Sequence, residues 1–221
     1  MSERLKRKIL HIFFPARCPV CGEVIGYMDR FCSECSDKLE NIVDSEEIKG
    51  AKSFTTAFAY DENTRPAIML LKDGICGNAD YAMGNELADC LADRGVLERI
   101  DMIIPVPMYK SDQSLRGFNQ AELIAKVIGR RFHIPVSVGT VIKNRKTKQQ
   151  KSLDREMRKK NLAGAYSIRK PQNIAGKRVL LVDDVSTTGS TLTELTSLLL
   201  LAGASEVSCA ACCKTVMNNN F

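Results

Sequence analysis

Residues 178–192 read Arg-Val-Leu-Leu-Val-Asp-Asp-Val-Ser-Thr-Thr-Gly-Ser-Thr-Leu, and this stretch decides the fold class. Its apolar run at 179–182 is typical of a strand that is buried on both faces of a sheet. Two carboxylates follow, Asp183 and Asp184, then a loop of small hydroxylic residues, and a helix is expected over 190–201. A strand, a short loop and a helix in this order predict one unit of an α/β fold.

Apolar periodicity outside this stretch predicts further strands and helices in alternation. Strands are expected at 53–60, 101–106 and 206–213, and helices at 65–72, 78–93 and 114–131. Gly203 is expected to end the helix over 190–201 in a left-handed conformation. The alternation implies a parallel sheet that is flanked by helices on both faces.

The loop after the 179–182 strand suits a phosphate group. Ligands of open α/β sheets bind at the carboxyl ends of strands, and a helix N-terminus with successive loop amides attracts a phosphate dianion. Gly189 lets the backbone approach a ligand closely or take a left-handed conformation. The hydroxyls that would donate to the phosphate belong to Ser186, Thr187, Thr188, Ser190 and Thr191.

Asp183 and Asp184 would repel a phosphate unless they have a task of their own. Carboxylates accept hydrogen bonds from vicinal ribose hydroxyls, and a Mg²⁺ ion would offset the negative charge. Phosphate, diol and metal together describe a ribose 5-phosphate that carries a leaving group. The alternative is an ordinary loop in which one of the two carboxylates caps a helix or forms a salt bridge. The complete string, with its strand before and helix after, favours the phosphate site.

A cysteine cluster precedes the α/β pattern. Two Cys-x-x-Cys pairs are separated by ten residues. Each pair can hold a metal from a tight turn, and four thiolates complete a closed tetrahedral site of the structural type. The predicted ligands of Zn²⁺ are Cys18, Cys21, Cys32 and Cys35. Buried or redox-active thiols and an iron–sulfur cluster are the alternatives.

The composition is that of a globular protein. Of 221 residues 44% are hydrophobic and 26% charged, and the net charge of +6 permits an anionic partner without requiring one. No apolar run is long enough to span a bilayer. Residues 1–14 lack the apolar length and the cleavage site of a signal peptide, so they are expected to form an amphipathic helix. We therefore expect a cytoplasmic protein with an N-terminal helix and zinc ribbon at 1–45, an α/β domain at 50–217 and a disordered tail at 218–221.

The stretch 178–192 resembles the diphosphoribosyl-binding signature of type I phosphoribosyltransferases. Nearly the whole chain resembles one branch of that group, the ComF-type competence proteins, which carry a double zinc ribbon. The further matching segments are Cys18 to Cys35, Leu70-Leu71-Lys72, Ile104-Pro105-Val106-Pro107, Arg116-Gly117-Phe118-Asn119-Gln120-Ala121, Arg145 with Thr147 and Gln150, and Asn161 with Gly164-Ala165-Tyr166.

The resemblance implies a type I phosphoribosyltransferase-like sheet that binds 5-phosphoribosyl-1-diphosphate with Mg²⁺. The turn at Val106 and Pro107 would face the pyrophosphate, while Asp183 and Asp184 would hold the ribose hydroxyls. It also implies a role in natural competence and DNA uptake, with incoming single-stranded DNA and other competence or DNA-processing proteins as partners.

Arg116 follows the expected pyrophosphate turn, and its guanidinium is suited to neutralise a pyrophosphate. The alternative for Arg116 is a surface charge at a helix end.

The segment 143–160 holds nine Lys or Arg against one Asp and one Glu, so its local charge is 9 − 2 = +7. In the type I fold such an insertion would be a mobile flap that brings Arg145 and Lys148 to the pyrophosphate. Binding of DNA phosphates, or a solvated helix, would explain the same charges.

Two classes of function follow from these features. As a phosphoribosyltransferase, the protein would displace pyrophosphate from the ribose C1 with a nitrogen nucleophile, using Asp183, Asp184 and Arg116. As a binding module without catalysis, it would sense the sugar-phosphate and hold nucleic acid or a protein. A zinc-stabilised scaffold that binds proteins alone is the third hypothesis.

Overall fold

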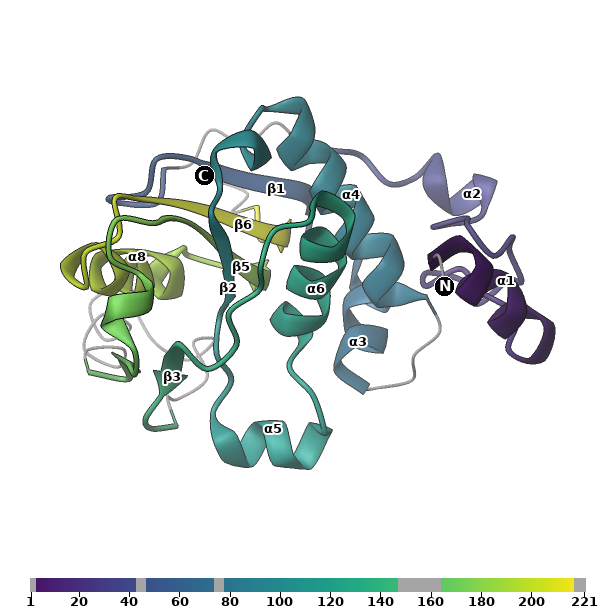
Figure 1. Cartoon of the computed structure of the whole chain (residues 1–221). Coiled ribbons are helices and arrows are strands. Elements are labelled where there is room, and N and C mark those ends of the chain that lie inside the picture. The colour runs from purple at the N-terminus through teal and green to yellow at the C-terminus, as the bar shows by residue number, and fades with distance from the viewer. Residues whose placement is uncertain (1–2, 43–46, 74–77, 147–163, 217–221) are drawn as a thin grey trace, which may run out of the picture.

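The computed structural model describes residues 3–42, 47–73, 78–146 and 164–216. Its centre is a parallel sheet with the strand order β1-β6-β5-β2 (Figure 1). The strands span Phe54–Ala59 (β1), Met102–Pro105 (β2), Arg178–Ser186 (β5) and Glu206–Lys214 (β6). The predicted parallel sheet is therefore confirmed, and β5 extends through both carboxylates to Ser186.

Helices cover both faces of the sheet, as predicted. Leu180 and Val182 of β5 pack in one core with α4 (Ala79–Asp93) and α6 (Gln120–Phe132). Val179 and Leu181 point to the opposite face and pack in a second core with α8 (Ser190–Leu201). Figure 1 shows α8 on one side of the sheet and the other two helices on the other side. The short helices α3 (Arg65–Asp73), η1 (Leu97–Arg99) and η3 (Pro171–Asn173) also belong to this part of the chain.

The single helix predicted over 114–131 is wrong, because two residue signals divide it. A first helix, α5, spans Lys110–Arg116 and ends where Gly117 takes a left-handed φ of 83°. The second, α6, begins after Asn119, whose side-chain oxygen accepts a hydrogen bond from the Ala121 N–H at 3.1 Å. A glycine that ends one helix and an asparagine that caps the next thus form a corner within the Arg-Gly-Phe-Asn-Gln-Ala motif.

A small antiparallel pair was not predicted. It consists of β3 (Val141–Lys143) and β4 (Tyr166–Ile168). A parallel bridge between Tyr109 and Lys143 joins β3 to the chain that follows β2. The predicted flap or DNA-binding segment 143–160 lies outside the described residues from 147 onward, including Lys148.

The N-terminal residues form a separate small module that docks on α4. Its helices are α1 (Glu3–Phe13) and α2 (Ser33–Ser36), so the predicted N-terminal helix is confirmed. An arginine of the module, Arg30, forms ion pairs with Glu86 and Asp89 of α4 at 2.9 and 2.6 Å. Of the helices that the structure describes, none has the length and apolar character needed to cross a bilayer. The predicted tail 218–221 lies outside the described residues.

Candidate functional site

The connection from β5 to α8 encloses a cavity of about 200 Å³. Its lining consists of Asp183, Val185, Ser186, Thr187, Gly189, Ser190, Thr191 and Leu192. Most of the residues that the sequence predicts for the phosphate loop therefore meet in one place. The Thr188 hydroxyl lies 2.8 Å from that of Ser190 and so belongs to the same loop. Gly189 has a left-handed φ of 65°, which favours glycine, and a Cβ atom there would also require Cδ1 of Ile48, 2.5 Å away, to move.

The two carboxylates differ in their surroundings because adjacent side chains of a strand point to opposite faces. Each carboxylate accepts a hydrogen bond at 2.9 Å from the backbone N–H of the next residue. Burial raises the pKa of Asp183 well above its usual value, and the neighbouring charge of Asp184 adds to this rise. An ionised Asp183 therefore has a cost that a hydrogen-bond donor, or a cation, would offset.

Lys143 supplies a cation near Asp183. Its Nζ lies 5.6 Å from the ring centre of Tyr166, which stands on the neighbouring strand β4. Burial lowers the pKa of Lys143, while the charges of Asp183, Asp112 and Glu194 oppose that shift. Burial also raises the pKa of Tyr166, as does the charge of Asp183. Sequence reasoning missed both residues as individuals, although Lys143 opens the basic segment and Tyr166 ends the Gly-Ala-Tyr motif.

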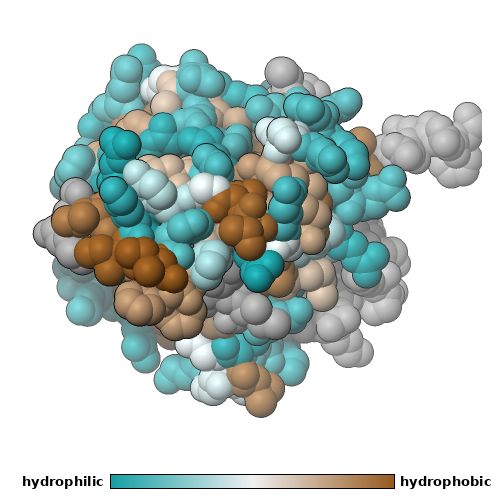
Figure 2. All heavy atoms as spheres, turned by 90° about the vertical axis from the view of Figure 1, so that its right-hand side faces the viewer, coloured by the Kyte–Doolittle hydropathy of each residue, from teal (hydrophilic) through white to brown (hydrophobic). Residues whose placement is uncertain are grey.

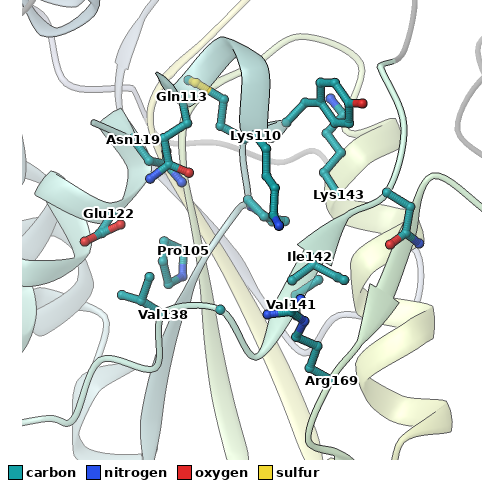
Figure 3. A pocket seen from close by; sticks show the side chains of 15 residues that line it. Pro105, Lys110, Gln113, Asn119, Glu122, Val138, Val141, Ile142, Lys143 and Arg169 are labelled. Carbon is teal, nitrogen blue, oxygen red and sulfur yellow. The ribbon is translucent and has the colours of Figure 1, made fainter. Parts of the chain in front are cut away.

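A second cavity, of about 430 Å³, lies between the end of β2 and the β3–β4 pair. In Figure 3 the side chains of Lys110 and Arg169 extend into it from opposite walls. Pro107 lines this cavity, and so does Lys143, which connects it with the surroundings of Asp183. Sequence reasoning did not assign Lys110 or Arg169 to a site, because their approach depends on the bridge between Tyr109, just before α5, and Lys143 of β3.

Val106 is buried and is held by two backbone interactions. Its N–H donates to the Val182 carbonyl at 2.8 Å, and its carbonyl accepts from the Asn119 side chain at 2.9 Å. The predicted pyrophosphate turn is thus tied both to β5 and to the start of α6. Asn119 therefore serves two elements at once, which the sequence motif alone did not reveal.

The two predicted arginines occupy different positions. Arg116 is exposed at the end of α5 and does not belong to the lining of either cavity. Arg145 is exposed just after β3. Burial raises the pKa of Glu194 on α8, and the positive charge of Arg145 partly opposes that rise. The structure thus brings Arg145, but not Arg116, near α8.

The four predicted cysteine ligands converge. Their Sγ atoms all lie within 4.8 Å of one another, and those of Cys21 and Cys32 are 3.6 Å apart. A tetrahedral Zn²⁺ with Zn–S bonds near 2.3 Å needs sulfur atoms roughly 3.8 Å apart, so the group fits the ion. Burial opposes ionisation of Cys18, yet hydrogen bonds from neighbouring backbone amides prevail and lower its pKa to about 7. Among the described residues, this is the one place where ligand atoms of three or more His, Cys, Asp or Glu side chains converge.

Comparison with known proteins gives the same two modules. The double zinc ribbon domain matches residues 9–47, and the phosphoribosyl transferase domain matches residues 118–217. The DNA utilization protein YhgH of Salmonella typhimurium is 34% identical over 211 residues, which cover 90% of this chain and 84% of that protein.

Two competence proteins are similar as well. Competence protein F of Haemophilus influenzae is 41% identical over 108 residues, or 48% of this chain and 47% of that protein. Competence protein ComFC of Bacillus subtilis is 26% identical over 191 residues, or 86% of this chain and 71% of that protein. With its cysteine cluster, its parallel sheet and these relatives, the chain belongs to the ComF-type competence protein family, which joins a double zinc ribbon to a phosphoribosyltransferase domain.

Proposed function

We propose that the protein binds 5-phosphoribosyl-1-diphosphate with Mg²⁺ at the β5–α8 connection. One observation carries the proposal: a single cavity is lined by Asp183, by the hydroxylic residues after it and by the first turn of α8. The 5-phosphate would accept hydrogen bonds from the Ser190 and Thr191 hydroxyls and from loop amides. Asp183 and Asp184 would accept hydrogen bonds from the ribose hydroxyls.

The donor atoms beside this cavity suit Mg²⁺. Mg²⁺ prefers oxygen ligands and often takes one or two carboxylates together with substrate phosphates. Asp183 and Asp184 supply carboxylate oxygens on adjacent residues of β5. The ion would neutralise the diphosphate and so assist its departure. Because two carboxylates do not complete an octahedron, we expect metal binding to depend on the diphosphate ligand.

The remaining charged residues would serve the pyrophosphate. Lys110 and Lys143 line the cavity beside the Pro107 turn, where a diphosphate would meet two cations. Arg145 and Arg116 would contribute if the segments that carry them move toward the ligand. With a bound acceptor, its nitrogen would form a bond to the ribose C1 while the C1–O bond breaks and pyrophosphate leaves with the electron pair. The carboxylates would stabilise the positive charge that develops on the ribose.

We propose that this site serves competence and the handling of incoming single-stranded DNA within the cell. Support comes from the relatives, which are named competence proteins and DNA utilization proteins. The alternative is a module that binds nucleic acid or protein partners without catalysis and uses the site as a sensor. The charge of the 143–160 segment favours that alternative as much as it favours a flap.

Calorimetric titration of 5-phosphoribosyl-1-diphosphate with Mg²⁺ tests the ligand. We expect micromolar binding to the wild type and none to Asp183→Asn/Asp184→Asn. Asp101→Asn is the matched control, because Asp101 pairs with Arg178 at the other end of β5. If the folded, zinc-loaded wild type binds no sugar-phosphate, the proposal fails.

A second pair of measurements separates catalysis from binding. Pyrophosphate release on addition of nucleobases would identify a transferase. Binding of single-stranded DNA that falls steeply with salt, and that is lost in Lys146→Glu/Lys148→Glu/Lys151→Glu, would identify the binding module. If the protein binds the sugar-phosphate but shows neither pyrophosphate release nor DNA binding, both assignments are contradicted.

A further inference from the structure

Helix α1 docks on the rest of the protein through its charged side. The Arg7 guanidinium lies 3.4 Å from the ring centre of Tyr81, and its Nη2 donates to the Asn78 side-chain oxygen at 2.6 Å. Arg7 also donates through Nε to the Tyr27 carbonyl at 2.7 Å. His11, one turn further on the same side, accepts the Ala16 N–H at 3.0 Å. The inward face of α1 is therefore polar.

The apolar side of α1 points away from the protein. Ile9, Ile12 and Phe13 are 44%, 72% and 73% exposed, and Phe14, the next residue, is 77% exposed. Figure 2 looks onto the side of the molecule that carries α1 and shows apolar side chains gathered there among hydrophilic ones. An amphipathic helix normally buries its apolar face, so this arrangement indicates that another apolar phase covers it.

The charges beside the apolar face indicate the nature of that phase. At 3.6 residues per turn, Lys6 and Lys8 lie on opposite sides of the Ile9–Ile12–Phe13 face, and both are exposed. A second copy of this helix would bring four such lysines together, which like-charge repulsion opposes. An anionic surface, by contrast, would satisfy the lysines while it receives the apolar side chains.

We propose that α1 holds this protein on an anionic membrane surface and lies in the plane of the lipid headgroups. Its 11 residues are about 16 Å long, roughly half the thickness of the hydrocarbon layer, so the helix cannot cross it. Docking through Arg7 leaves one face for the lipid, and that face carries large apolar side chains with lysines at its borders. This pattern is typical of helices that bind at the lipid–water interface. The inference does not depend on the sugar-phosphate site.

Vesicle flotation of the full, zinc-loaded chain tests the proposal. We expect binding to vesicles of phosphatidylcholine with 30% phosphatidylglycerol, and much weaker binding to phosphatidylcholine alone. Ile9→Ser/Ile12→Ser/Phe13→Ser should lower the partition coefficient by on the order of a hundredfold, because three apolar side chains no longer enter the lipid. Lys6→Gln/Lys8→Gln should lower the partition coefficient about tenfold. This difference from the wild type should shrink as the salt concentration rises, because salt screens the attraction of the lysines to the lipid.

Leu201→Ser is the matched control, because Leu201 is 87% exposed at the far end of α8 and should leave binding unchanged. Zinc content and circular dichroism show that each variant is folded. The proposal is overturned if the wild-type protein does not float with the anionic vesicles and remains in the buffer fraction. A second result would also overturn it: analytical ultracentrifugation finds that the wild type is a dimer and the triple serine variant a monomer, and neither protein binds vesicles.

Discussion

At the scale of single residues, Asp183 is the residue whose surroundings are least like those of a free carboxylate. It follows four fully buried apolar residues of β5 and faces the same side of the sheet as Val179 and Leu181. Lys143 lowers its pKa, but burial and Asp184 raise it by more. The folded protein therefore carries an acidic group that costs free energy when it ionises in the absence of a ligand. Binding sites commonly have this property.

Asp183→Asn should stabilise the protein without ligand at neutral pH. Because the pKa of Asp183 is raised on folding, the native state binds more protons than the unfolded state, and stability falls as pH rises above about 4. The asparagine removes this decline and can still accept the Asp184 N–H. We expect a gain on the order of 1 kcal/mol in urea unfolding at pH 8, and a smaller gain at pH 5.

Asp101→Asn provides the control of opposite sign. Hydrogen bonds from Arg178 lower the pKa of Asp101, so its stabilising contribution is present above the pKa of the unfolded state and is lost as pH falls. The Asp101 variant should therefore be less stable than the wild type at pH 7, with a difference that shrinks in acid. If the stability of Asp183→Asn changes with pH in the same way as that of the wild type, the pKa of Asp183 is not raised on folding and the prediction is wrong.

At the scale of elements, α6 packs on α4 as well as on β5 and β2 of the sheet. Gly84 on α4 makes this approach possible, since a Cβ atom there would lie 2.8 Å from Cβ of Val127. Helix α6 in turn is capped by Asn119, which donates a hydrogen bond to the Val106 carbonyl. The contact between the two helices thus supports the turn that we assign to the pyrophosphate.

Gly84→Ala should destabilise the protein although alanine is the better helix former. The added methyl overlaps Val127, and overpacking of this kind costs about 1–3 kcal/mol, which exceeds the propensity gain of about 1 kcal/mol. Urea unfolding measures the loss. Val127→Ala in the same chain should recover part of it, because it removes Cγ1 and Cγ2, two of the three Val127 atoms that the added methyl overlaps. If Gly84→Ala alone is as stable as the wild type, the two helices move apart without a cost in free energy and the prediction is wrong.

At the scale of the whole molecule, the cysteine module packs on α4 and on Phe58 of β1. The cysteine module has its own small cluster of buried residues, centred on Cys18, Ile25 and Cys35. Arg30 and Arg131 bind Asp89 from the module and from α6, and Phe31 packs near Phe58 with a ring distance of 6.3 Å. The fully buried residues of the two sheet cores lie outside the module, and from the module only the partly buried Val20, Phe31 and Leu39 pack against one of them. We therefore expect the sheet domain to fold without the metal.

Loss of zinc should unfold the module and leave the sheet domain folded. A segment this small lacks the buried area to fold alone, so its metal supplies the folding free energy. We expect Cys35→Ser to lose the zinc, seen by atomic absorption, and trypsin to cleave it within 3–42, while the segments that form the sheet resist in the variant as they do in the wild type. Cys90→Ser should keep the metal. Retained zinc in the Cys35 variant, or digestion of the whole chain, would contradict this division.

Sequence by itself determined the features that depend on neighbouring residues. The apolar run at 179–182 became a strand because β-branched and leucine side chains without polar interruption suit a sheet covered on both faces. Gly203, with a φ of 95°, ends α8 as expected. The paired cysteines met because each pair grips from one local turn. In each case the deciding interaction involves residues that are close in sequence, so the sequence pattern is enough to predict it.

Tertiary structure alone decided the features that join distant segments. The corner at Gly117 was marked in the sequence, but the apolar spacing across it suggested one continuous helix. Lys143 meets the surroundings of Asp183 because β3 packs beside the sheet, a contact across 40 residues that no local spacing encodes. Likewise the amphipathic pattern of α1 predicted a helix, but not that Arg7 would face inward and Phe13 outward. That choice rests on Tyr81 and Asn78, which only folding brings to α1.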